Sequence, residues 1–464
     1  MAGGDERLDD GTANNGLALA RGLVDAFDAI RRALPPPAGG VGERLADHLG
    51  VDHAVPGVVE RFPISERVNV QVALDTLEAA SEHWELIGLQ SDIGNFNGFS
   101  VTALASGRFG GHIEEQAVEY TALAVDIDAT IACFRAGLVL TRHGDVPIGI
   151  LVFPVERGMQ PEVVVEVVAA GDGTAADALA RLKAIMREKN VFRGKTIAFS
   201  FGRHGDFGLR FAHVPSLSRS QVILPEATLT AIEEHTITMT QFASELAGAG
   251  QHLRRGLLLY GPPGTGKTHT VMYLCNQLVG RTVIILSGPA VQAVGQAGSL
   301  ARDLQPAMIV IEDVDLIGLD RGLPGGAHNP LLFQLLNEMD GIGDDADVIF
   351  VLTTNRVDLL EPALAARPGR VDSAIEVPLP DEEARSRLFQ LYLPDQSIRS
   401  DVLDAVVAGT AGVPAAFIKE LSRRCVLHSL AMNTSFDEAL PRALNDMLTN
   451  ASPVLRRTLG VITE

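Results

Sequence analysis

One eight-residue segment constrains the fold of this chain more than any other feature. Residues 261–268 read Gly-Pro-Pro-Gly-Thr-Gly-Lys-Thr, and the apolar run 257–260 precedes them. Glycines at these positions let backbone N–H groups turn inward around a phosphate, while the lysine supplies a cation and the threonine a hydroxyl ligand for Mg²⁺. A helix N-terminus also attracts anions. The pattern therefore predicts a buried strand, a phosphate-binding loop and a helix.

Apolar strands alternate with helical segments in the second half of the chain. Because such alternation builds a parallel sheet sandwiched by helices, we expect a P-loop NTPase sheet in an α/β fold. After Pro380 the pattern is purely helical to about residue 450, which predicts a small helical lid. The expected strands are 257–260, 283–286, 308–311, 348–352 and 374–377.

The first half of the chain mixes the two periodicities. Apolar runs at 147–153, 163–168 and 196–201 predict buried strands, and 175–189 predicts an amphipathic helix. We therefore expect a mixed α/β N-terminal domain that binds a client or partner. The expected domains are a leader with N-terminal helices (1–55), the mixed α/β domain (56–216), the α/β ATPase domain (221–380), and the helical lid with a C-terminal tail (381–464).

Composition excludes several classes of protein. The 464 residues carry a formal net charge of −20, so we do not expect nucleic acid as a partner. Three widely separated cysteines give neither a disulfide framework nor zinc-ligand spacing, as in a reducing cytoplasm. The acidic N-terminus predicts no signal peptide, and no run of about 18 apolar residues predicts a membrane span. We expect a cytoplasmic protein.

Polar residues follow two of the later strands. Glu312 and Asp313 end the apolar run 308–311, where one carboxylate can reach Mg²⁺ through water and the other can orient an attacking water. Asn355 ends the next strand and can hydrogen-bond that water without adding charge. Arg367 and Arg370 flank Pro-Gly, and a guanidinium there can stabilise charge on a transferred phosphoryl group.

Taken together, these segments resemble the AAA subfamily of AAA+ ATPases, with a single ATPase domain. The resemblance covers about residues 221–450 and leaves the residues before 216 unassigned. The segments that carry it, in the family's order, are Gly261–Thr268, Ile311–Asp315, Leu335–Gly341, Thr353–Arg356 and Arg367–Asp372.

The resemblance implies a role for each matching residue. Thr268 and Glu312 are expected to hold Mg²⁺, and Glu312, Asp313 and Asn355 to act in ATP hydrolysis. Arg367 and Arg370 match arginine fingers, which act on a neighbouring subunit of a hexameric ring, and 340–342 match an intersubunit signalling loop. The expected ATP-binding residues are Gly261, Pro262, Pro263, Gly264, Thr265, Gly266, Lys267, Thr268 and His269.

Two departures from the family pattern affect activity. The acids stand in the order Glu312-Asp313 instead of Asp-Glu, and a displacement of about 1 Å at a catalytic group costs about 100-fold in rate if nothing compensates. Either the longer Glu312 side chain shifts the metal, or a shift of the backbone compensates for the exchanged side-chain lengths. Asp315 is another candidate carboxylate for hydrolysis. In the pore loop, 288–295, Ala293 stands in place of the aromatic residue with which threading members grip a polypeptide.

Two functions remain open at this level. The chain is expected to be a Mg²⁺-dependent ATPase that forms a ring and remodels protein clients or assemblies. The alternative is a nucleotide-switched oligomeric scaffold with slow hydrolysis and no threading, which Ala293 and the exchanged acids favour. A DNA-handling motor is disfavoured by the acidic charge. The segment 320–329 reads equally as a second pore-facing loop or as a connector.

Overall fold

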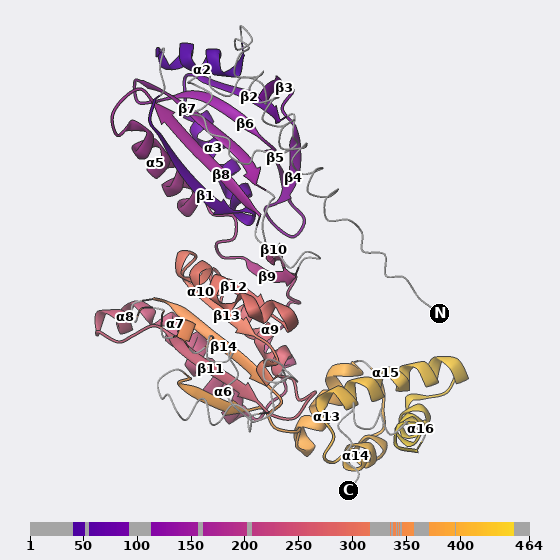
Figure 1. Ribbon diagram of the computed structural model, residues 1–464. Helices are drawn as coiled ribbons and strands as arrows, with labels where there is room; N and C mark the ends of the chain where they lie inside the picture. Colours follow the sequence, from indigo (N-terminus) through magenta and orange to yellow (C-terminus); the bar gives the residue numbers. More distant parts are fainter. Residues whose placement is uncertain are drawn as a thin grey trace, which may run out of the picture. The chain divides into compact units, whose positions relative to one another are not determined.

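The computed structural model describes residues 40–51, 55–91, 113–155, 161–201, 207–315, 335, 337–339, 341, 343, 346–356, 371–394 and 396–449. The chain divides into two compact units, residues 1–190 (unit 1) and 191–464 (unit 2). Figure 1 shows the elements of both. Most of the expected leader, residues 1–39, and the segment 320–329 lie outside the described residues.

Unit 1 is built on a six-stranded antiparallel sheet in the order β1-β8-β7-β6-β2-β3. The predicted strands at 147–153 and 163–168 are β7 and β8 at its centre (Figure 1). The strands are β1 Gly57–Pro63, β2 Trp84–Ser91, β3 Ile113–Gln116, β6 Gly137–His143, β7 Val146–Val155 and β8 Glu162–Ala169.

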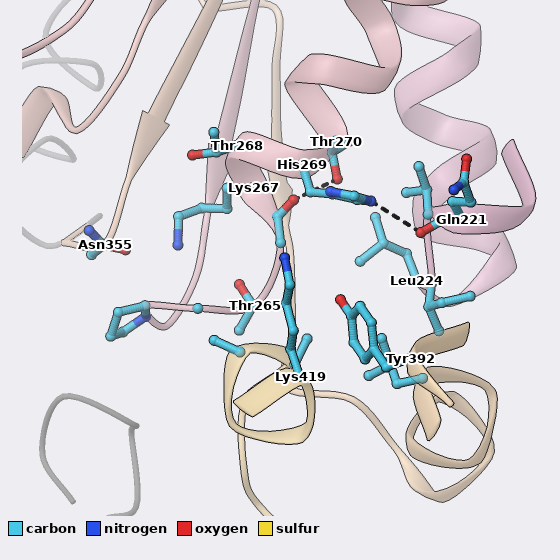
Figure 2. A pocket seen from close by; sticks show the side chains of 18 of the residues that line it. Gln221, Leu224, Thr265, Lys267, Thr268, His269, Thr270, Asn355, Tyr392 and Lys419 are labelled. Atoms are coloured by element: carbon cyan, nitrogen blue, oxygen red, sulfur yellow. Dashed lines mark hydrogen bonds between the residues drawn. The ribbon is translucent and has the colours of Figure 1, made fainter. Parts of the chain in front are cut away.

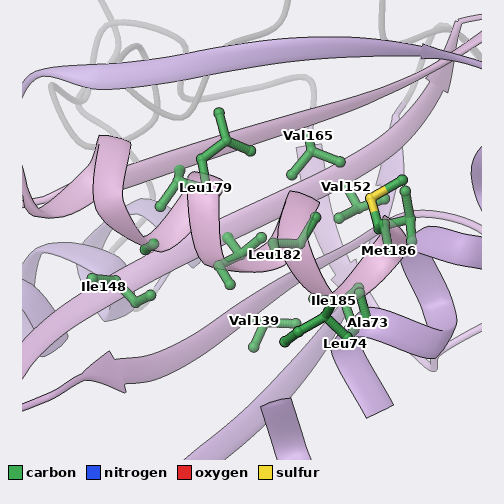
Figure 3. Close-up of a cluster of buried hydrophobic side chains, with 14 of the residues drawn as sticks. Ala73, Leu74, Val139, Ile148, Val152, Val165, Leu179, Leu182, Ile185 and Met186 are labelled. Atoms are coloured by element: carbon green, nitrogen blue, oxygen red, sulfur yellow. The ribbon is translucent and has the colours of Figure 1, made fainter. Parts of the chain in front are cut away.

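Helices cover both faces of this sheet, which explains why β7 and β8 are buried along most of their length and are mainly apolar. In β8, Val165 packs in a core with helices α3 and α5, whereas Val164 packs in a second core with helix α2. Figure 3 shows the first of these cores, with Leu182 of α5 against the sheet. The helices are α2 Val41–Leu49, the 3-10 turn η1 Ile64–Glu66, α3 Arg67–Ala79 and α5 Thr174–Glu188.

A separate two-stranded ribbon belongs to the same unit. Strands β4 (Tyr120–Ala124) and β5 (Thr130–Phe134) pair antiparallel, with Tyr120 opposite Phe134. Four of the five β4 residues are exposed. The ribbon therefore offers most of β4 to solvent instead of packing it into a core.

Unit 2 contains the predicted parallel sheet. Five strands run parallel in the order β12-β13-β14-β11-β15, and all five correspond to the strands expected from the sequence. They are β11 Arg255–Tyr260, β12 Thr282–Leu286, β13 Ala307–Ile311, β14 Val348–Thr354 and β15 Ser373–Glu376. The α/β fold class is confirmed.

The sheet also has two strands that lie within the segment expected to belong to the N-terminal domain, and only the first of them was predicted as a strand. Residues 196–201 were expected in the N-terminal domain, but they form β9 (Thr196–Phe201), which pairs parallel with β12 at the edge of the ATPase sheet. Strand β10 (Phe207–Phe211) then pairs antiparallel with β9. The first compact unit therefore ends at residue 190, not 216. The apolar run encodes a strand, but nothing within it specifies which sheet it joins.

The helices of unit 2 surround the sheet and form the lid. The helical segment from Glu226 to Gly248 is interrupted by a π-helical turn, η3, and ends before Gly250, which has a left-handed φ of 74°. The predicted lid is confirmed as four helices after Pro380, the first capped by the Asp381 carboxylate, which accepts from the Ala384 N–H at 2.8 Å. The elements are η2 Arg219–Gln221, α6 Glu226–Glu233, η3 Glu234–Thr238, α7 Met239–Gln241, α8 Ala243–Gly248, α9 Lys267–Gln277, η4 Gly288–Ala293, α10 Val294–Asp303, α13 Glu382–Tyr392, α14 Ser400–Gly409, α15 Ala415–Met432 and α16 Phe436–Thr449.

Within the described part of the chain, no helix is both long enough and apolar enough to cross a membrane.

Candidate nucleotide site

The phosphate-loop segment has the geometry that its glycines predict. Strand β11 is buried to Leu259, and the loop runs from Gly261 to the start of α9 at Lys267. Gly261 has a φ of 146°, and a Cβ there would lie 2.3 Å from the Val377 carbonyl oxygen. Gly264 has a φ of 75°, and its Cβ would lie 2.9 Å from the Ala416 Cβ in the lid. Only glycine fits these two positions without displacement.

Lys267 is the cation of this loop and lies at the N-terminus of α9. It is only 6% exposed, and its Nζ donates to the carbonyl oxygens of Gly261 and Pro262 at 2.8 and 2.9 Å. Burial lowers the pKa of Lys267, and Asp313 and Asp315 partly oppose that effect. Because its charge is poorly solvated, a phosphate placed there gains a strong electrostatic partner.

The loop forms one side of a cavity of about 410 Å³. This volume lies within the range of about 300–1,000 Å³ that is typical of small-molecule sites. Of the predicted ATP-binding and catalytic residues, the cavity is lined by Pro263, Gly264, Thr265, Gly266, Lys267, Thr268, His269, Asp313 and Asn355 (Figure 2). Gly261, Pro262 and Glu312 are not among its lining residues.

Asp313 and Asn355 meet at the cavity because they follow adjacent parallel strands. The Asn355 Nδ2 donates to the Asp313 Oδ1 at 3.2 Å, and the Asp313 N–H donates to the Thr353 Oγ1 at 3.1 Å. Asp313 has a left-handed φ of 51°, a conformation that is uncommon for a residue with a side chain and that clusters at functional sites. The backbone turn thus presents the shorter acid of the exchanged pair to the cavity.

The other two acids have different surroundings. Asp315 is buried, and its Oδ1 accepts from the Thr354 Oγ1 and the Asn355 N–H at 2.8 and 3.1 Å. It therefore positions the end of β14. Glu312 is half-buried. Burial raises the pKa of Cys275 on α9 to about 12, and the charge of Glu312 adds to that rise. Cys275 is two turns from Thr268 on the same helical face, and metal binding by Glu312 and Thr268 stays a prediction.

The lid and the segment before α6 supply lining residues that sequence reasoning missed. Lys419 extends from α15 into the space between Thr265 and Tyr392 (Figure 2), with its Nζ 5.9 Å from the Tyr392 ring centroid. Their separation from the loop by more than 100 positions left no local signal. The remaining missed lining residues are Gln221, Val222, Ile223, Leu224, Thr270 and Leu388. Ala415 and Ala416 of the lid also line the cavity.

His269 joins the two ends of the cavity. Its Nε2 lies 3.2 Å from the Gln221 carbonyl oxygen, and burial, followed by the charge of Lys419, lowers its pKa. These surroundings favour the neutral imidazole, which does not repel the nearby Lys419 cation. The cavity has a phosphate end with Lys267 and an apolar end with Leu224 and Tyr392, which together match a nucleotide.

Several predicted functional residues lie outside the described residues. These are the arginine fingers Arg367 and Arg370, and Asp340 and Ile342 of the signalling loop. Among the described residues, no group of three or more His, Cys, Asp or Glu side chains is arranged to hold a metal ion. Mg²⁺ at this kind of site is held by one or two protein oxygens together with the phosphates, and Thr268 in the cavity lining fits that pattern.

The predicted pore loop is folded into unit 2. Residues 288–293 form the 3-10 turn η4, in which Ala290, Val291 and Ala293 are 4, 3 and 0% exposed. The exposed side chains of this turn are Pro289 and Gln292. The turn therefore exposes no aromatic side chain.

The parallel sheet, phosphate loop and lid define a P-loop nucleotide-binding protein. Residues 257–379 match the family described as ATPase family associated with various cellular activities (AAA). The chain therefore carries an AAA ATPase domain, a class that uses ATP with Mg²⁺, and the resemblance seen in the sequence is confirmed.

Relatives of several kinds share this region. Human ATPase family gene 2 protein homolog A is 30% identical over 259 residues, which is 53% of this chain and 29% of that protein. The 26S proteasome regulatory subunit 6A of Encephalitozoon cuniculi is 33% identical over 217 residues, 44% of this chain and 52% of the relative. The proteasome-activating nucleotidase of Methanopyrus kandleri is 38% identical over 181 residues, 36% of this chain and 41% of the relative. The chain thus spans between 29% and 52% of these relatives.

Proposed function

We propose that this chain is a Mg²⁺-dependent ATPase that works as a ring on protein clients or assemblies. The observation that carries the proposal is the single cavity that joins Lys267 of the phosphate loop, the Asp313–Asn355 pair and the lid. Two of the similar proteins are named for the proteasome, which supports a protein as the client.

The residues of the site have distinct roles in this proposal. When bound, Mg²⁺ would supply positive charge to offset the charge of the phosphates, and Thr268 with Glu312 would hold it. Lys267 would exchange its two loop carbonyl partners for phosphate oxygens. Asp313, oriented by the Asn355 amide, accepts the proton of the attacking water. The carboxylate–amide distance of 3.2 Å supports this pairing.

Ring assembly is proposed to complete the site, because Arg367 and Arg370 act on the ATP of the neighbouring subunit. The test mixes Lys267→Ala subunits, which lack the phosphate contact, with Arg367→Ala subunits, which lack the finger. We expect each variant to be inactive alone and the mixture to regain part of the turnover through composite sites. Turnover per chain that is independent of protein concentration, with both variants fully active, would refute the proposal.

One observation favours the alternative, a nucleotide-switched scaffold that does not thread its client. Ala293 is fully buried in η4, so the position that matches the gripping aromatic residue of threading family members projects no side chain here, and the exposed Pro289 and Gln292 are not aromatic. The two functions can be distinguished by using a stably folded fluorescent protein with an unstructured tag as the test client. ATP-dependent loss of its fluorescence supports threading. Retained fluorescence, together with ATP-dependent ring assembly in light scattering, supports the scaffold.

We further propose that the protein works in the cytoplasm. Burial raises the pKa of Cys133 and Cys425 to about 11 and that of Cys275 to about 12, and all three are free thiols. Protonated, buried thiols suit a reducing compartment. Fractionation of cells that produce the tagged chain tests this.

A further inference from the structure

Unit 1 contains a cavity of about 340 Å³ that the nucleotide chemistry does not use. Its walls come from helix α3, the start of β2 and the paired ends of β4 and β5. Three aromatic side chains and two carboxylates line it: Trp84, Tyr120, Phe134, Asp75 and Glu78.

A buried amide fixes the acidic wall of this cavity. Gln71, Asp75 and Glu78 share one face of α3 because they are four and seven positions apart. Gln71 is 8% exposed, its Nε2 donates to the Asp75 Oδ1 at 2.7 Å, and its Oε1 accepts from the Phe134 N–H at 3.0 Å. The same side chain thus holds one carboxylate and the end of β5 in place.

The aromatic wall is accessible to a ligand. Tyr120 is 57% exposed although it is the first residue of β4, and Trp84 is half-buried at the start of β2. An aromatic face next to a carboxylate attracts an organic cation, because the ring quadrupole and the negative charge act together. Arginine and lysine side chains, which combine an apolar stem with a charged head, fit such a lining.

The charge of the lining is negative. None of the described residues that line the cavity is a lysine or arginine. Arg67 lies one turn before Gln71 on α3, and its guanidinium donates to the Phe134 carbonyl oxygen at 2.9 Å. Arg67 is not one of the lining residues, and the described lining carries the carboxylates of Asp75 and Glu78.

We propose that this cavity binds an arginine or lysine side chain of a polypeptide. The inference deepens the proposed function, in which this part of the chain selects a protein client. It requires no nucleotide, and the binding is therefore measured in the Lys267→Ala variant as well as in the native chain. If the Lys267→Ala variant lacks ATPase activity and still binds the peptide, the two proposals are tested independently, because the failure of one does not entail the failure of the other.

Trp84 lines the cavity and is the single tryptophan of the chain, so tryptophan fluorescence reports binding at this cavity. The probe is a capped, otherwise neutral pentapeptide with one central arginine, titrated against the full-length protein while Trp84 fluorescence is recorded. The comparison peptide carries citrulline, the neutral isostere of arginine. We expect saturable quenching by the arginine peptide that weakens with salt, and at least fivefold weaker binding of the citrulline peptide.

Two sets of variants test the walls separately. Because exposed charge pairs contribute modestly, Asp75→Asn with Glu78→Gln is expected to weaken the arginine peptide about five- to tenfold. Asp172→Asn, an exposed acid in the turn before α5, is the matched control and leaves affinity unchanged. Tyr120→Leu changes an exposed position of the aromatic wall and is also expected to weaken binding. It tests the cavity independently if the acid variant fails to fold.

Three results would overturn the proposal. The first is equal affinity for the arginine and citrulline peptides. The second is unchanged binding in both the acid and the Tyr120→Leu variants while circular dichroism shows native folding. The third is free spermidine that quenches at lower concentration than the peptide, which assigns the cavity to a small polyamine instead.

Discussion

The contact between the phosphate loop and the lid permits a sharp test of the nucleotide site. Gly264 has a φ of 75°, and a Cβ there would lie 2.9 Å from the Ala416 Cβ, while the Ala416 N–H donates to the Gly264 carbonyl oxygen at 3.0 Å. In the Gly264→Ala variant, holding an alanine in this left-handed backbone conformation costs about 1 kcal/mol or more of free energy. The overlap with Ala416 adds about 1–2 kcal/mol, since the lid can shift slightly.

Together these costs disfavour the binding-competent loop by about 2–3 kcal/mol, which weakens nucleotide affinity about 30- to 150-fold. The assay is equilibrium titration with a fluorescent ATP analogue and Mg²⁺. Gly250→Ala is the matched control, since Gly250 has a φ of 74° with nothing within 4 Å of its Cβ and does not line the cavity. Its affinity is expected to be native.

A second substitution separates strain from overlap. Adding Ala416→Gly to Gly264→Ala removes the overlap but not the backbone strain, and it is expected to recover about five- to thirtyfold of the affinity. Ala416→Gly alone corrects for the effect of glycine on the lid helix. The reasoning fails if the double variant binds no better than Gly264→Ala, or if Gly264→Ala and Gly250→Ala bind equally well.

Three further predictions concern stability, catalysis and pH. Asp347→Ala removes the carboxylate that lies 2.8 Å from the Arg281 Nη2 and 3.9 Å from the Arg255 Nη2, both guanidiniums being at most 2% exposed. We expect the free energy of unfolding of unit 2 to fall by about 3–5 kcal/mol in urea titrations followed by circular dichroism, and a loss below about 1 kcal/mol contradicts this. Asn355→Ala is expected to slow ATP turnover about 100-fold in a phosphate-release assay while nucleotide affinity changes little; equal losses of both would assign Asn355 to binding. Burial lowers the pKa of His235 and His269 in the folded chain. As the pH falls, these histidines therefore bind protons in the unfolded chain before they do so in the folded chain. The free energy of unfolding is accordingly highest above about pH 6.5, the ordinary pKa of histidine, and declines below it. Unfolding midpoints at pH 5 and 7 check this, and the decline should shrink in His235→Gln with His269→Gln.

The elements set by local chemistry were predictable from the sequence. The phosphate loop could be predicted because Gly261 and Gly264 must adopt conformations that other residues resist and Lys267 must follow at a fixed spacing. The five parallel strands could be predicted because each is a continuous apolar run between helical segments. The meeting of Asp313 with Asn355 followed from a topological rule, since the carboxyl ends of adjacent parallel strands share one edge.

Contacts between distant segments were not predictable in the same way. Lys419 and Tyr392 reach the cavity only because the lid folds back onto the loop, and neither position has a distinctive local pattern. The run 196–201 encodes a strand, but its pairing with β12 depends on an open sheet edge that lies about 80 residues later in the sequence. The left-handed turn at Asp313, which decides which acid enters the cavity, is likewise a product of its hydrogen bond to Thr353.

The segment that follows β9 and β10 is held against the helix that begins in the phosphate loop. This segment runs from the sheet edge to the cavity and is attached to α9 at two points. The Asn276 Nδ2 donates to the Pro215 carbonyl oxygen at 2.8 Å, and the His269 Nε2 lies 3.2 Å from the Gln221 carbonyl oxygen. His269 and Asn276 are seven positions apart and therefore share one face of the helix that begins at Lys267. These two contacts hold residues 215–221, which lie between β10 and α6, against the face of α9 that carries His269 and Asn276.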